Sequence, residues 1–123
     1  MKNAISWFEI PVADLDRAQR FYETVLAQPL RREDFDGETL ALLPFERPAP
    51  GGCLQAGANA SAAPASGIRI YLECGPDIDA VLRRVETAGG QVVAPKAALP
   101  RGLGFIAHLR DTEGNEVGLH SPA

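Results

Sequence analysis

Three segments of the chain alternate apolar side chains with polar or aromatic ones, as expected for β-strands that have one polar face. In the first segment, Trp7 and Glu9 alternate with apolar neighbours. The matching positions of the other two segments are Arg69, Tyr71 and Glu73, and Glu116, Gly118 and His120. If the three faces converge, they would hold a small, partly planar organic molecule by stacking, by charge and by proton transfer.

Five of these side chains have a candidate role in binding or catalysis. Trp7 and Tyr71 could stack on a planar ligand, and Arg69 could hold a carboxylate or a phosphate. Glu9 and His120 could act as a catalytic acid–base pair, because histidine titrates near neutral pH. Each also has a structural alternative. Trp7 could belong to the core, Glu9 could form an ion pair with Arg69, and His120 could be exposed near the end of the chain.

Four further positions complete the predicted ligand-binding set. Glu73 and Glu116 lie near the ends of their strands, where carboxylates are commonly solvated. Gly118 would leave room for a ligand where another residue would place a side chain. His108 lies on a separate predicted strand whose faces the pattern does not fix, and a packing histidine is its simpler interpretation. The full set is Trp7, Arg69, Tyr71, Glu73, His108, Glu116 and Gly118.

Two amphipathic helices are predicted to support these strands. The first begins at Asp14, whose carboxylate can accept hydrogen bonds from the first turn, and it ends before Pro29. Its apolar positions at helical spacing are Leu15, Ala18, Phe21, Tyr22, Val25 and Leu26. Asp77 begins the second helix in the same way, and Gly89-Gly90 ends it. Each helix has one apolar stripe, which must pack against a sheet.

The remaining elements are predicted strands in the same order in both halves. They cover residues 4–12, 30–35, 39–45 and 53–56, and then residues 68–74, 91–94, 103–110 and 117–120. Residues 57–67 carry no large side chain and are predicted to form a flexible linker. Strand, helix and three strands, repeated, predict an α+β fold of two paired βαβββ modules, residues 1–56 and 68–123, in a single domain of residues 1–123.

Two motifs, one near each end of the chain, resemble those of a known superfamily. The first contains Val12, Asp14, Ala18, Phe21 and Tyr22, and the second is Asp-Thr-Glu-Gly-Asn at residues 111–115. In their order and spacing they are similar to motifs of the glyoxalase/bleomycin-resistance/dioxygenase superfamily, also called vicinal oxygen chelate. The resemblance spans nearly the whole chain. It implies two modules that form a curled mixed sheet around a concave cleft, and a homodimer.

Members of this superfamily that do metal chemistry place their ligands at fixed strand positions. The resemblance assigns Trp7, Arg69 and Gly118 to three of these positions. An indole and a guanidinium offer no acceptor to a cation, and glycine has no side chain. We therefore expect no metal cofactor, and a divalent metal is disfavoured. A metal site of new geometry would have to use Glu9, His108 and His120.

Three functions remain open on this sequence. The first is a metal-free protein that binds a small aromatic or carboxylated molecule in a cleft. The second is a lyase- or isomerase-type enzyme of the superfamily, which uses Glu9 and His120 or a non-standard metal site. The third is a structural or regulatory module whose cleft is filled by its own side chains.

Composition limits the partners and the location that we expect. The 123 residues carry a formal net charge of −4, so no basic surface for nucleic acid is expected. The first residues lack the apolar segment of a signal peptide, and no apolar run is long enough to span a bilayer, so we expect no membrane partner and a cytoplasmic location. Cys53 and Cys74 are too few for a disulfide framework and are expected to be small buried side chains.

Overall fold

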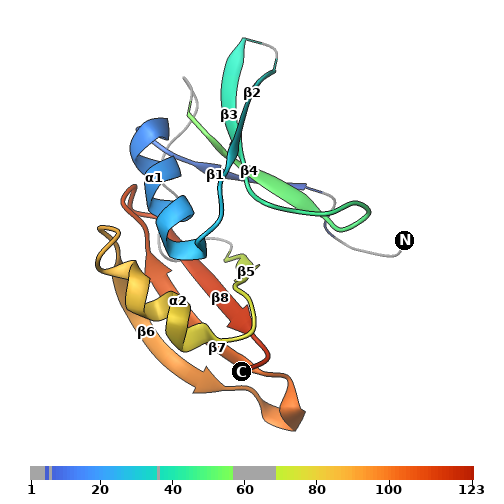
Figure 1. Ribbon diagram of the computed structural model, residues 1–123, viewed down its shortest axis with the longest axis vertical. Helices are drawn as coiled ribbons and strands as arrows, with labels where there is room; N and C mark the ends of the chain where they lie inside the picture. The colour runs from blue at the N-terminus through green and yellow to red at the C-terminus, as the bar shows by residue number, and fades with distance from the viewer. Residues whose placement is uncertain (1–4, 6, 36, 57–68) are drawn as a thin grey trace.

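The structure is a computed structural model that describes residues 5, 7–35, 37–56 and 69–123 (Figure 1). Its elements follow the predicted order in both halves. The first half contains β1 (Trp7–Pro11), α1 (Leu15–Leu26), β2 (Arg31–Phe35), β3 (Glu38–Leu42) and β4 (Gly51–Gln55). The second contains β5 (Tyr71–Glu73), α2 (Ile78–Val85), β6 (Gln91–Ala98), the 3-10 turn η1 (Pro100–Gly102), β7 (Phe105–Arg110) and β8 (Glu116–Ser121).

Each half forms its own open, four-stranded mixed sheet. The first sheet has the strand order β1-β4-β3-β2, and the second has the equivalent order β5-β8-β7-β6. In both, the first strand runs parallel to the last strand of its half, and the other neighbours are antiparallel. The predicted α+β class with two βαβββ halves is therefore confirmed, and neither sheet closes into a barrel.

The two helices begin and pack as their sequences predict. The side chain of Asp14 accepts a hydrogen bond from the Arg17 amide at 3.0 Å, and that of Asp77 accepts one from the Asp79 amide at 3.0 Å. Their buried residues are Ala18, Phe21, Tyr22 and Val25 in α1, and Ile78, Val81 and Val85 in α2. These stripes belong to one core that includes both halves. Figure 1 shows the two helices next to each other, and they are in contact.

Strand β6 differs most from its prediction, because it continues through Pro95 to Ala98. A proline is tolerated there since β6 is an edge strand, and its pairing with β7 shifts register on both sides of Ala94. The predicted linker 57–67 lies outside the described residues. Cys53 and Cys74 are free and buried, as expected. In the part of the chain that is described, neither helix has the length and apolar character needed to cross a bilayer.

Candidate functional site

The second sheet has one face that packs against α2 and one polar face that points away from it. On β5, Leu72 is buried, whereas Tyr71 and Glu73 are exposed. On β8, Val117 and Leu119 are buried in the core. The polar face therefore receives Arg69, Tyr71, Glu73, His108, Arg110, Glu116, Gly118 and His120, and strand pairing arranges them in rows across the sheet.

The first of these, the charged row, places one carboxylate between two guanidinium groups. Arg69 Nη2 lies 3.1 Å from Glu116 Oε2, and Arg110 Nη2 lies 2.9 Å from Glu116 Oε1. Arg110 also donates from Nη1 to the side-chain oxygen of Gln91 at 3.2 Å. Because two positive charges meet one negative charge, the row keeps a net charge of about +1 on the open face of the sheet.

The neighbouring row contains a tyrosine–histidine pair over a glycine. The Tyr71 hydroxyl lies 2.9 Å from Nε2 of His108, and the two ring centroids are 5.6 Å apart. A methyl group at Gly118 would lie within 3 Å of the Tyr71 ring. The space that we expected Gly118 to leave for a ligand is thus occupied by Tyr71. The glycine leaves room for the ring, which crosses the strand at this point.

The environment of His108 favours the neutral imidazole. Its pKa is lowered first by burial and then by the charge of Arg69, while the carboxylate of Glu116 opposes these effects. A neutral imidazole has one nitrogen that donates and one that accepts. The Tyr71 hydroxyl can therefore donate a hydrogen bond to a ligand when His108 donates to it. It can accept one from a ligand when it donates to His108.

The third row contains His120 and Glu73, which are register partners on β8 and β5. His120 Nε2 donates to the backbone carbonyl oxygen of Leu103 at 2.7 Å. This bond ties the connection between β6 and β7 to the last strand. Gly104 lies at the same contact, where a methyl group would come 3.2 Å from His120 Nε2. His120 thus has a structural contact of its own, and Glu73 is exposed.

The other two predicted residues lie on the first sheet. Trp7 is 39% exposed and packs edge-on against Phe45, with ring centroids 5.7 Å apart. Glu9 is exposed and is the register partner of buried Cys53. The pKa of the Cys53 thiol is raised to about 11, first by burial and then by the charge of Glu9, which disfavours the reactive thiolate.

The strands of the two sheets are not close neighbours within one chain. No Cα atom of β1 or β4 lies within 8 Å of a Cα atom of β5 or β8. One chain therefore does not bring Glu9 beside His120, the proposed acid–base pair. The alternative ion pair of Glu9 with Arg69 is also not formed, because Arg69 bonds to Glu116 instead.

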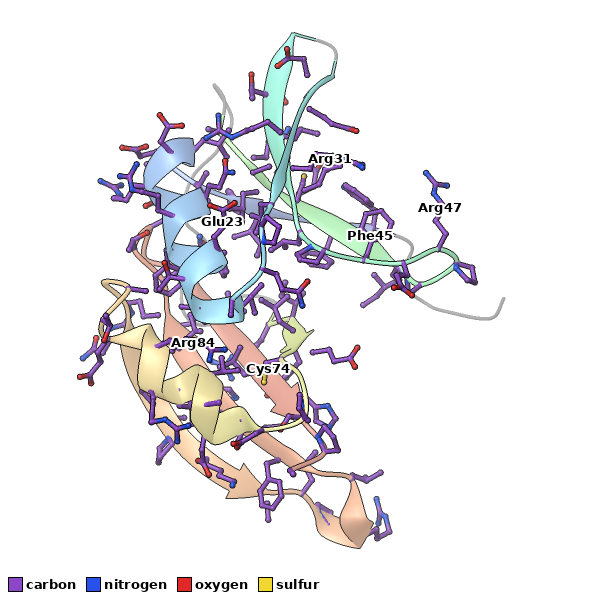
Figure 2. All side chains as sticks on the ribbon, viewed as in Figure 1. Glu23, Arg31, Phe45, Arg47, Cys74 and Arg84 are labelled. Atoms are coloured by element: carbon purple, nitrogen blue, oxygen red, sulfur yellow. The ribbon has the colours of Figure 1, made fainter. Side chains whose placement is uncertain are left out.

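A groove of about 1540 Å³ separates the two halves. Phe45 and Arg47 lie on one side of it, and Cys74 and Arg84 lie on the other (Figure 2). Three of the predicted site residues line this groove, namely Arg69, Tyr71 and Glu73. The polar face of the second sheet is therefore accessible from the groove along β5.

Two features were not predicted from the sequence: Arg110 and the connection between the halves. Arg110 could have been found, because it lies two residues after His108 and so shares its face. The connection is made by the turn at residues 111–115. Glu113 accepts hydrogen bonds from the Ala13 and Asp14 amides at 3.0 and 2.9 Å, and its Oε2 lies 2.6 Å from Nε of Arg17. No local pattern in the sequence indicates that this turn caps a helix of the other half.

The residues at the expected ligand positions do not fit a divalent metal. Arg69 is paired with Glu116, Gly118 lies under the Tyr71 ring, and Trp7 offers only an N–H donor. Over the described parts of the chain, no three His, Cys, Asp or Glu side chains are grouped closely enough to hold a metal ion. The alternative site is not assembled either, since its three members would have been Glu9, His108 and His120.

A model of the glyoxalase-like domain family matches residues 7–120. The chain belongs to this family. Its two half-sheets with paired helices also occur in solved structures of the wider vicinal oxygen chelate superfamily, as the sequence motifs predicted.

Three solved structures illustrate the likeness of this glyoxalase-like chain to known folds. TnmS3, an antibiotic binding protein from Streptomyces sp. CB03234, has a TM-score of 0.68 and 23% identity over 100% of this chain and 99% of its own. A glyoxylase/bleomycin resistance protein/dioxygenase domain from Frankia sp. EAN1pec has a TM-score of 0.71 and 21% identity over 98% and 93%. A glyoxalase I mutant from Zea mays has a TM-score of 0.71 and 23% identity over 94% of this chain and 46% of its own. At these identities the likeness concerns the fold, and no curated protein matches the chain at a significant level.

Proposed function

We propose that this protein binds a small, planar, anionic organic molecule on the polar face of the second sheet, without a metal cofactor. The observation that carries the proposal is the charged row, in which Arg69 and Arg110 share the single carboxylate of Glu116. The chain has a net charge of −4, yet the charged row on this open face is positive. This face therefore has a local preference for anions.

The side chains of this face suit an aromatic acid. A guanidinium has more N–H donors than the bonds to Glu116 and Gln91 use, so both arginines can bind an incoming carboxylate. Tyr71, which is 45% exposed, offers a ring face or edge beside them. The likeness to TnmS3, described as an antibiotic binding protein, supports the idea that a chain of this size and fold can work by binding alone.

The proposal is tested by titrating benzoate and 2-naphthoate into the purified protein and following amide chemical shifts by NMR. We expect saturable binding in the presence of EDTA, and we expect Arg69→Gln to weaken it about ten-fold, since one charge-assisted hydrogen bond is lost. Arg31→Gln is the matched control, because Arg31 is an exposed arginine of the first sheet with only a surface partner in Glu33. Binding that requires added metal, or that Arg31→Gln weakens equally, would contradict the proposal.

We further propose that the protein is a homodimer. Strand β1 is an edge strand, and two exposed large apolar side chains lie on or beside it: Ile5 and Trp7. Such side chains commonly mark protein–protein contacts when they gather along an edge. Sedimentation equilibrium at micromolar concentration should give twice the mass of the chain. A monomer mass over the whole concentration range would contradict the dimer.

A further inference from the structure

We propose that the ligand of the polar face is an aromatic monoacid with a hydroxyl group para to the acid, a proposal that rests on the binding function above. The acid group would lie at Arg69 and Arg110, and the hydroxyl would lie at the Tyr71–His108 pair. Two polar sites of different chemistry occupy neighbouring rows of this one sheet face.

The spacing of the two rows sets the length of the ligand. Glu116 and Gly118 mark the rows on β8, and Arg110 and His108 mark them on β7. Residues two apart on a strand are separated by about 6.6 Å, because the strand rises about 3.3 Å per residue. Among the isomers of a hydroxybenzoate, the para isomer places its two polar substituents furthest apart and comes nearest to this distance. Ortho substituents lie side by side and can reach one row alone.

The charge of the first row indicates how many negative charges the acid group carries. Arg69 and Arg110 together contribute two positive charges, and Glu116 already neutralises one of them. A carboxylate with a single charge completes the balance. A dianion would bring a second negative charge close to Glu116, which has no room to withdraw because its side chain is only 13% exposed.

The second row has the chemistry to recognise a hydroxyl group. The Tyr71 hydroxyl, bonded to His108 on one side, is exposed on the other, and its hydrogen can point either way. When Tyr71 donates to the imidazole, its oxygen can accept a hydrogen bond from the ligand hydroxyl. When His108 donates, the Tyr71 hydroxyl can donate to a phenolate. A ligand without this hydroxyl makes no hydrogen bond to the pair, which stays hydrogen-bonded to water, so the pair does not raise its affinity.

The test compares 4-hydroxybenzoate, 2-hydroxybenzoate, benzoate and 4-hydroxybenzamide by calorimetric titration. We expect 4-hydroxybenzoate to bind about ten-fold more tightly than 2-hydroxybenzoate and benzoate, because only it reaches both rows. The neutral 4-hydroxybenzamide should bind more weakly than the acid. Tyr71→Phe should remove the preference for 4-hydroxybenzoate over benzoate. Arg31→Gln, on the first sheet, should leave both affinities unchanged and serves as the control.

The outcomes separate this inference from the function on which it rests. If all three acids bind equally, or if 2-hydroxybenzoate binds most tightly, the para arrangement is wrong and the binding function stands. If Tyr71→Phe weakens benzoate and 4-hydroxybenzoate alike, Tyr71 acts by stacking and the hydroxyl assignment is wrong. If no acid binds to the folded protein at millimolar concentration, both proposals fail.

Discussion

Replacing Glu113 with glutamine should lower the free energy of unfolding by about 3 kcal/mol, because it removes the charge from a buried, fully hydrogen-bonded carboxylate. The side chain of Glu113 has no exposed surface, and its oxygens accept from Arg17, Thr112 and the Ala13 and Asp14 amides. These amides begin α1, which lies in the other half of the chain. The loss therefore weakens a helix start and the contact between the halves at the same time.

The same carboxylate should make the stability depend on acid. Burial alone would raise the pKa of Glu113, but hydrogen bonds from Arg17, Asp14 and Thr112 outweigh it and lower the pKa from 4.5 to about 2. Between these values the unfolded chain binds the proton and the folded chain does not. Stability is therefore present above pH about 4.5 and falls as the pH drops toward about 2, by about 3 kcal/mol in total.

Urea unfolding of the wild type and of Glu113→Gln, at pH 7 and at pH 3, measures both effects. The difference between the two proteins should be large at pH 7 and should shrink at pH 3, because the unfolded wild type binds the proton at that pH. Glu33→Gln is the matched control, since Glu33 pairs with Arg31 on the surface at 3.2 Å and should cost well under about 1 kcal/mol. An equal, pH-independent loss in both variants would show that the burial of Glu113 does not matter.

The contacts of this turn explain why family membership leaves the chemistry open. Asp111 accepts hydrogen bonds from the Tyr22 hydroxyl at 2.7 Å and from the Asn115 amide at 2.8 Å, and Asn115 Nδ2 donates to the Pro11 carbonyl. Both sequence motifs that indicate the superfamily therefore meet in space and hold the halves together. Their role is architectural, because each buried polar atom needs a fixed partner. They say nothing about what lies on the polar face.

The sequence predicts well what depends on local geometry. Asp14 and Asp77 are predictable helix starts, since a carboxylate satisfies the free amides of the first turn wherever the helix lies. The alternation of Leu72 with Tyr71 and Glu73 likewise assigns the two faces of β5 before the sheet is known. Element order follows from the same periodicities. For this reason the fold class could be stated from sequence, and the structure confirms it.

What the sequence does not predict is contact between residues far apart in the chain. Arg69 and Glu116 are separated by 46 intervening residues, and nothing in either segment favours this ion pair over Arg69 with Glu9. The Tyr71 ring over Gly118 is equally non-local, so the glycine suggested free space that the tyrosine fills. The gap between the sheets also depends on how α1 and α2 pack. The sequence therefore assigns the site residues to one face of their strands, but it does not predict which of them lie together.

Gly90→Ala should cost about 3 kcal/mol, whereas Gly118→Ala should be nearly neutral, although both added methyl groups would lie within 3 Å of an aromatic ring. At Gly90 the obstacles are the ring of Phe21, which is 1% exposed in the core, and the backbone oxygen of Arg110 at 2.7 Å. Neither can withdraw without moving the sheet or the helix. At Gly118 the obstacle is Tyr71, whose ring is 45% exposed and can turn into the groove.

Turning the ring away has a measurable consequence beyond stability. In Gly118→Ala the Tyr71 hydroxyl should leave His108, and the pKa of His108, which burial lowers most, should rise toward its ordinary value in an NMR titration. A small stability change with a raised His108 pKa would mean that Tyr71 is a movable part of the polar face. If Gly118→Ala is as destabilising as Gly90→Ala, the ring belongs to the packing of the sheet, and ligand recognition would have to depend on the charged row alone.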